Sequence, residues 1–146
     1  MADLAPAASF ETAVAVLAAQ PFNDVVGAEI TRFENGEAIL ELPIADRHRQ
    51  QYGLVHGGVL AYLADNALTF ACGSTLGNRI ITTGLSITYV AGARDGVLRA
   101  TGQVVASTGT IAVATVTVEE IAADGSTRTC AAGQGTATVT ETSRRG

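Results

Sequence analysis

One carboxylate stands alone in a long apolar stretch of this sequence. Asp65 is the sole charged residue between Gly58 and Thr75. Burying a carboxylate costs free energy unless other groups compensate it, and perturbed ionisable groups gather at functional sites. We therefore interpret Asp65 as a partly desolvated general base or nucleophile. The structural alternatives are a bond to a neighbouring helix end, an arginine partner, or a position facing solvent.

A histidine and two glycines, His56-Gly57-Gly58, precede this stretch where a helix would begin. Glycine lets the backbone approach a ligand closely, and the free N–H groups of a helix N-terminus stabilise developing negative charge. An ordinary glycine-rich loop entering a helix would have the same sequence. His56 is either a general base or, as we favour, a structural residue that holds the turn.

The spacing of these two features has a geometric consequence. Gly57 and Asp65 are eight positions apart, which is roughly 12 Å along a helix. One carbonyl group cannot contact both ends of that span. If both act on one carbonyl, the second must come from an antiparallel partner helix, so the catalytic interpretation requires a two-fold dimer with two composite sites.

The elements that must position these residues follow from periodicity and turn signals. Ser9 is a plausible helix cap and Pro21 ends the first helix, while Asn35-Gly36 is a strong hairpin signal. The breaks between the later strands are short and rich in turn formers, which favours an antiparallel meander. The predicted elements are helices over 10–19 and 58–75 and strands over 25–33, 37–42, 80–90, 97–107, 111–121 and 127–139.

The long helix is apolar nearly all round, which is typical of a helix wrapped by a sheet or covered by a partner. The pattern therefore predicts an α+β fold in which one long helix packs against an antiparallel sheet. The 146 residues suit one domain. Within it, residues 1–21 form an N-terminal helical extension and residues 142–146 a frayed tail.

Composition narrows the possible partners. The net charge of −5 and the absence of Trp argue against nucleic acid. No apolar run approaches the roughly 20 residues of a membrane span, and Asp3 stands where a secretion signal would be basic. Cys72 and Cys130 cannot form a disulfide framework and lack zinc-ligand spacing, so we expect buried thiols, a cytoplasmic location and no metal.

At residues 52–67 the sequence, YGLVHGGVLAYLADNA, resembles the signature of hotdog-fold thioesterases of the phenylacetate-pathway (PaaI) type. The Gly-x-x-His-Gly-Gly run, followed by Asp seven residues after its last glycine, carries the likeness, which extends from about residue 22 to 140. It implies a hotdog fold, with a central helix wrapped by a five- or six-stranded antiparallel sheet. It also implies an acyl-CoA substrate, no cofactor, and a homodimer at minimum, with a homotetramer favoured.

The resemblance implies a role for several residues. Asp65 would be the nucleophile or general base, and the Gly57 N–H, helped by Gly58, would polarise the thioester carbonyl. Thr82 stands where the family often has a hydroxyl that positions water. His56 would orient the turn and contact substrate. A further substrate contact is expected from Gln50. By helical spacing, Tyr62, Leu68, Thr69 and Cys72 share the Asp65 face of the helix, where they either line the pocket or pack in the core, and we expect Tyr62 and Thr69 to contact substrate.

The sequence does not distinguish an acyl-CoA thioesterase from an esterase or from a thioesterase that acts on carrier-protein substrates, and two other functions also stay open. Relatives commonly have Asn at the position of Gln50, and this departure is compatible with a non-catalytic acyl-CoA-binding module on the same fold. The other is a hotdog hydratase or dehydratase. Hydratase relatives often place His five residues after the Asp, where this chain has Phe70, and dehydratases use Glu on the helix.

Overall fold

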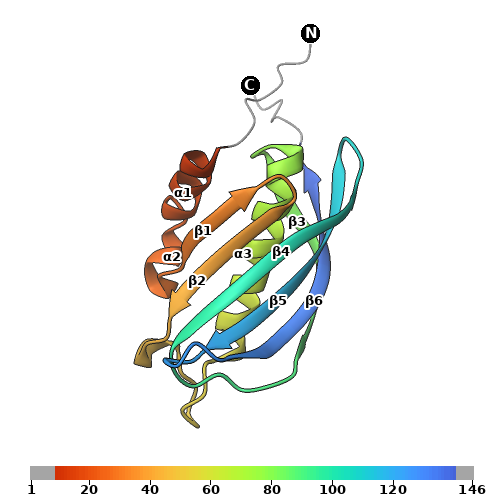
Figure 1. The fold of residues 1–146 in the computed structure, drawn as a ribbon. Helices are drawn as coiled ribbons and strands as arrows, with labels where there is room; N and C mark the ends of the chain where they lie inside the picture. The colour runs from red at the N-terminus through yellow and green to blue at the C-terminus, as the bar shows by residue number, and fades with distance from the viewer. Residues whose placement is uncertain (1–8, 141–146) are drawn as a thin grey trace.

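The computed structural model describes residues 9–140, which form a six-stranded antiparallel sheet with one long helix against it (Figure 1). This confirms the predicted α+β hotdog architecture. The 142–146 tail and the start of the N-terminal extension lie outside the described residues. The elements are α1 (Phe10–Ala18), α2 (Pro21–Val26), β1 (Glu29–Glu34), β2 (Glu37–Pro43), a 3-10 turn (Asp46–His48), α3 (Gly57–Leu76), β3 (Ile80–Tyr89), β4 (Val97–Ser107), β5 (Ile111–Ile121) and β6 (Thr127–Val139).

The strand order is β1-β2-β4-β5-β6-β3. The hairpin at Asn35-Gly36 is confirmed, and Gly36 adopts the positive φ of 83° that such a turn requires. The expected meander is correct for β4, β5 and β6. It is wrong for β3, which pairs with β6 at the far edge and not with β4. The reason is that α3 crosses the sheet face between β2 and β3 and carries the chain to the opposite edge.

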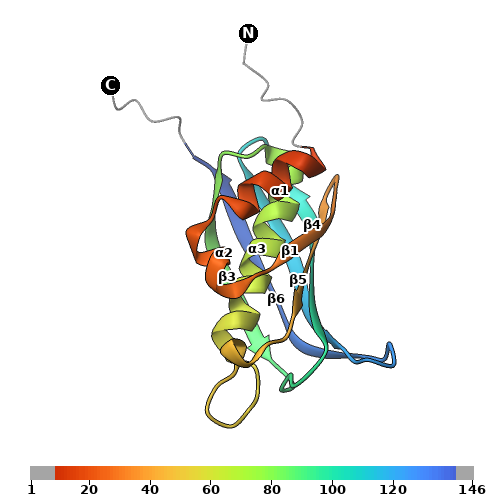
Figure 2. The ribbon, with the colours of Figure 1, turned by 90° about the vertical axis from the view of Figure 1, so that its left-hand side faces the viewer.

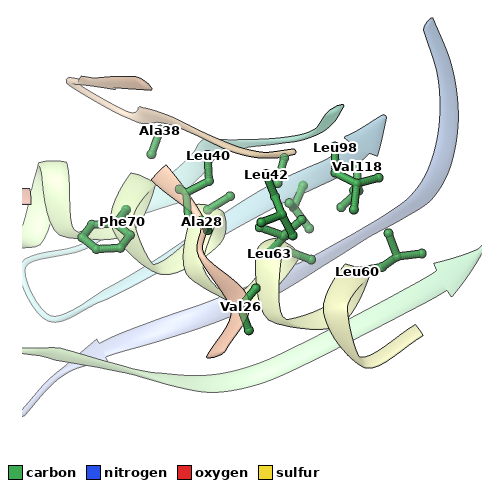
Figure 3. Close-up of a cluster of buried hydrophobic side chains, with 14 of the residues drawn as sticks. Val26, Ala28, Ala38, Leu40, Leu42, Leu60, Leu63, Phe70, Leu98 and Val118 are labelled. Atoms are coloured by element: carbon green, nitrogen blue, oxygen red, sulfur yellow. The ribbon is translucent and has the colours of Figure 1, made fainter. Parts of the chain in front are cut away.

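Helix α3 packs against β2, β4, β5 and β6, with α1 and α2 on the same side of the sheet (Figure 2). Its apolar side chains meet the inward side of the strands in a continuous core (Figure 3). Leu40, Leu63, Leu98 and Val118 are completely buried there. The prediction that the sheet wraps this helix is confirmed, because α3 contacts all six strands and is buried at intervals from Leu60 to Gly73.

Residues 21–28 differ from the prediction of a strand starting at Val25. Pro21 follows the first helix and is also the first residue of α2. Proline suits this position because its fixed φ is helical and no N–H is needed there. Gly27, in the left-handed conformation at φ 83°, ends α2. The Asn23 side chain then donates to the Ala28 carbonyl at 3.0 Å and accepts from the Ala28 N–H at 3.1 Å.

The first helix itself is as predicted, and Ser9 caps it by accepting a hydrogen bond from the Thr12 N–H at 3.1 Å.

Helix α3 approaches the sheet closely at Gly102 of β4, where a Cβ atom would lie 2.3 Å from the Ala67 carbonyl oxygen. We predict that Gly102→Ala lowers the free energy of unfolding by about 1–3 kcal/mol, as overpacking does, measured by urea titration. The control is Gly109→Ala, which adds the same methyl group where no atom lies within 4 Å. Equal stability of the two variants would contradict this packing.

Candidate active site

Asp65 lies midway along α3 and is half-buried. Its Oδ1 accepts a hydrogen bond of 2.5 Å from the Thr82 hydroxyl and one of 3.3 Å from the Thr69 hydroxyl. The two threonine oxygens are 2.6 Å apart. No described residue hydrogen-bonds Oδ2, and no buried side-chain oxygen in the described chain lacks a partner. Oδ2 is therefore accessible from the adjoining pocket, while Oδ1 is held in place.

Two of the structural alternatives for Asp65, a bond to a neighbouring helix end and an arginine partner, are absent among the described residues. None of the ion pairs among residues 9–140 includes Asp65, so no arginine compensates its charge. Its polar partners are hydroxyl groups from its own helix and from β3. The register of β3 shifts between Thr82 and Gly84, and an irregularity of this kind re-aims a side chain at the edge of a sheet.

A pocket of about 600 Å³ opens in front of Asp65, a size suited to a small-molecule ligand. It brings together five of the residues predicted from the sequence: Gly58, Tyr62, Asp65, Thr69 and Thr82. Phe22 of α2 and Leu85 of β3 add apolar surface, and Gln20 and Asn66 add amide groups.

The turn before α3 is built around His56. His56 is the N-cap residue, and its Nδ1 accepts a hydrogen bond of 2.8 Å from the Gly58 N–H. A Cβ on Gly58 would lie 2.9 Å from that Nδ1, which accounts for the glycine. Because the Gly58 N–H is engaged by His56, only Gly57 of the two glycines offers an N–H without a partner among the described residues.

Gly57 faces a second pocket, of about 360 Å³, which also includes Gln50 and Tyr89. The Tyr89 hydroxyl donates to the Gly57 carbonyl at 3.2 Å. The Gln50 side-chain oxygen accepts from the Tyr52 N–H, so this amide is fixed to its own loop. Within one protomer, the residues proposed for one reaction thus divide between two pockets, with Gly57 in one and Asp65 in the other.

A polar network between α2 and α3 was not foreseen from the sequence. The Tyr62 hydroxyl donates to Asn23 Oδ1 at 2.9 Å and lies 3.4 Å from Gln20 Oε1. Gln20 in turn donates to Asn66 Oδ1 at 3.0 Å. Burial raises the pKa of the Tyr62 hydroxyl, and its ring packs edge-on against Phe22 with centroids 5.2 Å apart. Tyr62 therefore presents its ring to the pocket and uses its hydroxyl to hold α2.

Two other residues on the Asp65 side of the helix do not line this pocket. Leu68 and Cys72 are completely buried in a second apolar cluster with Ala112, Ala114 and Ala137. Both cysteines are buried free thiols, as expected.

Two further searches covered only residues 9–140. No helix there is long and apolar enough to cross a membrane. Nor do His, Cys, Asp and Glu side chains gather there in a group of three that could hold a metal ion.

Known proteins can be compared with this fold and site. The family model described as Thioesterase superfamily matches residues 52–122. A 1,4-dihydroxy-2-naphthoyl-CoA hydrolase from Listeria monocytogenes serotype 1/2a (strain 10403S) is 29% identical over 84 residues, which cover 56% of this chain and 68% of that protein.

Solved structures agree with this match. A thioesterase family protein from Silicibacter pomeroyi superposes with a TM-score of 0.82 at 25% identity, covering 89% of this chain and 97% of that one. The E. coli PaaI protein, from the phenylacetic acid degradation operon, is 21% identical with a TM-score of 0.77, covering 89% and 91%, and so supports the fold alone. Residues 52–122 therefore resemble the thioesterase superfamily, and the chain has the hotdog fold.

The His56 cap can be tested by its effect on stability. We predict that His56→Ala lowers the free energy of unfolding by about 1 kcal/mol, the usual cost of losing a side-chain cap. His56→Asn, which restores an acceptor at the N-cap, should recover most of that loss. The measurement is urea unfolding followed by circular dichroism. If His56→Ala were as stable as the unmodified protein, the cap would contribute nothing.

Burial raises the pKa of the Cys72 thiol to about 11 and raises that of Cys130 as well. At pH 8 both thiols are therefore protonated and shielded. We predict negligible reaction of the native protein with Ellman's reagent at pH 8, and two reacting thiols per chain in denaturant. Fast modification of the native protein would contradict this description of the cysteines.

Proposed function

We propose that this protein is an acyl-CoA thioesterase, in which Asp65 acts as nucleophile or general base on a thioester whose carbonyl is polarised by the Gly57 N–H of a second protomer. The observation that carries the proposal is the state of the Asp65 carboxylate. One oxygen is fixed by Thr82 and Thr69, and the other is free and faces a ligand-sized pocket. The hydrolase and thioesterase names among similar proteins support the same reaction class.

In the general-base form of the reaction, Oδ2 of Asp65 removes a proton from water as the water oxygen bonds to the thioester carbon. The negative charge that develops on the carbonyl oxygen is stabilised by the Gly57 N–H. The C–S bond then breaks, CoA leaves as a thiolate that takes up the proton, and the free acid is released. In the nucleophilic form, Oδ2 attacks the carbon directly and the C–S bond breaks, which releases CoA and leaves an anhydride; water then cleaves the anhydride to the free acid and the Asp65 carboxylate.

The dimer in this proposal is supported by the separation of the two pockets and by the edge of the sheet. Strand β3 has a hydrogen-bonded neighbour on one side only, namely β6. Along and beside it, Ile81, Tyr89 and Val90 are each more than half exposed. An unprotected apolar edge strand of ten residues is a ready surface for pairing with another chain. We infer a cytoplasmic homodimer, with pairing of dimers into a tetramer.

The remaining predicted residues take supporting parts in this proposal. Thr82 donates its proton to Oδ1 and can still accept one from water, while the Thr69 hydroxyl lies 2.6 Å from that of Thr82 and 3.3 Å from Oδ1 and supports the same carboxylate oxygen. His56 orients the turn through Gly58. Gln50 lines the pocket at the Gly57 end, where the substrate carbonyl would enter.

The central test replaces the carboxylate by its uncharged amide. We predict that Asp65→Asn lowers kcat for acyl-CoA hydrolysis at least 10³-fold, because an amide cannot serve as base or nucleophile, while stability changes little. The measurement is thiol release from acetyl-, hexanoyl-, phenylacetyl- and palmitoyl-CoA. Thr82→Val, which removes only the hydroxyl, should give a smaller loss than Asp65→Asn.

Two results would contradict the proposed thioesterase activity. Acyl-CoA binding without thiol release, equal in the unmodified protein and Asp65→Asn, would indicate a non-catalytic binding module. Hydration of an enoyl-CoA without loss of the thioester would indicate a hotdog hydratase.

The role of Gly57 is tested by a matched pair of substitutions. Gly57 is the first residue of α3, a position where proline is tolerated, so Gly57→Pro removes the N–H with little effect on the helix. Gly57→Ala keeps the N–H and places a Cβ 3.4 Å from the Tyr89 ring. We predict a loss in kcat of about 10²–10³ for the proline variant, as for a lost oxyanion-hole donor, and a far smaller loss for alanine. Equal losses in the two variants would contradict the role of the N–H.

A further inference from the structure

A separate cavity of about 150 Å³ lies between α1 and the C-terminal half of α3. Helix α1 forms one side of the cavity with Thr12, Ala13 and Val16, and α3 forms another with Phe70 and Gly73. Phe33 of β1 closes the cavity. Protein interiors rarely leave voids larger than a water molecule. A void of this size is comparable to an engineered apolar cavity that accepts one benzene molecule.

This cavity adjoins the candidate active site. Gln20, Asn66 and Thr69 line both the cavity and the Asp65 pocket. Thr69 is also one of the two hydroxyls hydrogen-bonded to Asp65 Oδ1. The Gln20–Asn66 hydrogen bond of 3.0 Å, which joins two partly buried side chains, lies at the boundary between the two spaces. The cavity therefore adjoins the Asp65 pocket through these three shared residues.

Gly73 gives a second, independent indication that this space is kept open. It is buried inside α3, where glycine is less favourable than alanine. The glycines at 102, 133 and 135 are required by contact, because a Cβ at each would lie 2.0–2.3 Å from a backbone oxygen. At Gly73 the nearest atom to an added Cβ is the Ile80 Cδ1, at an ordinary 3.5 Å, and φ is not positive. Packing does not demand a glycine here, and its missing side chain enlarges the cavity.

We propose that this cavity receives the distal end of the acyl group and that Gly73 sets the size of acyl group accepted. The proposal rests on the thioesterase function above and adds to it a substrate class. The substrates are thioesters whose acyl group, beyond the carbons at Asp65, is no larger than a short aliphatic chain or one six-membered ring. The acyl pocket lies within one protomer, with α1 as its outer wall.

The test fills the cavity with one methyl group. Gly73→Ala should lower kcat/KM for hexanoyl-CoA about fourfold, the value of one buried methylene, and Gly73→Val at least tenfold. Neither should change kcat/KM for acetyl-CoA more than twofold, because that acyl group ends before the cavity. Gly73→Ala should also raise Tm, since alanine favours the helix, so lost activity cannot be attributed to unfolding. Gly109→Ala, far from the site, should change nothing.

A parallel binding measurement keeps this test independent of catalysis. In the Asp65→Asn background, isothermal titration calorimetry measures the affinity for hexanoyl-CoA and for CoA. We expect the affinity that the hexanoyl group adds to fall about fourfold when Gly73→Ala is introduced. Equal effects of Gly73→Ala on acetyl- and hexanoyl-CoA, or a preference of the unmodified protein for palmitoyl-CoA, would overturn the assignment of the cavity. If no acyl-CoA were hydrolysed but the binding gain still depended on Gly73, the thioesterase proposal would fail and the cavity assignment would stand.

Discussion

The rigid spacing of two groups along one helix governs the interpretation of this protein. Helix α3 is a 20-residue element held on one face by the sheet, so Gly57 at its start and Asp65 in its middle are fixed roughly 12 Å apart. No rotamer change brings the Asp65 carboxylate to the Gly57 N–H of the same chain. A reaction that needs both must therefore assemble its site from two chains, and in the proposed dimer the two separate pockets of one protomer would each supply half of a site.

The fold tolerates a lone carboxylate on an apolar helix because hydroxyl groups hydrogen-bond one of its two oxygens, while the other oxygen stays accessible from the pocket. Thr82 and Thr69 satisfy Oδ1, which offsets part of the cost of partial burial. The open Oδ2 then needs water or substrate as its partner. Fixing one oxygen also orients the other, so the same hydrogen bonds that stabilise Asp65 in the fold direct its free oxygen into the pocket.

Local patterns were enough to predict much of this structure. The apolar run around Asp65 predicted α3 to within one residue at each end, and turn residues located the strands from Val97 onward. The prediction failed where tertiary contacts decide the outcome. Pro21 was interpreted only as a stop signal, although it also starts α2. The Gln20–Asn66 contact joins residues 46 positions apart, and the pairing of β3 depends on the path of α3, so neither leaves a periodic signal in the sequence.

The most direct test of the central claim is complementation between two inactive variants. Asp65→Asn and Gly57→Pro protomers, refolded together in equal amounts, would form mixed dimers in which one composite site has both groups intact. Random pairing makes half of the dimers mixed, each with one of its two sites restored, so the account predicts recovery to roughly a quarter of the unmodified thioesterase activity. No recovery in a mixture shown to contain mixed dimers would contradict a site shared between two chains.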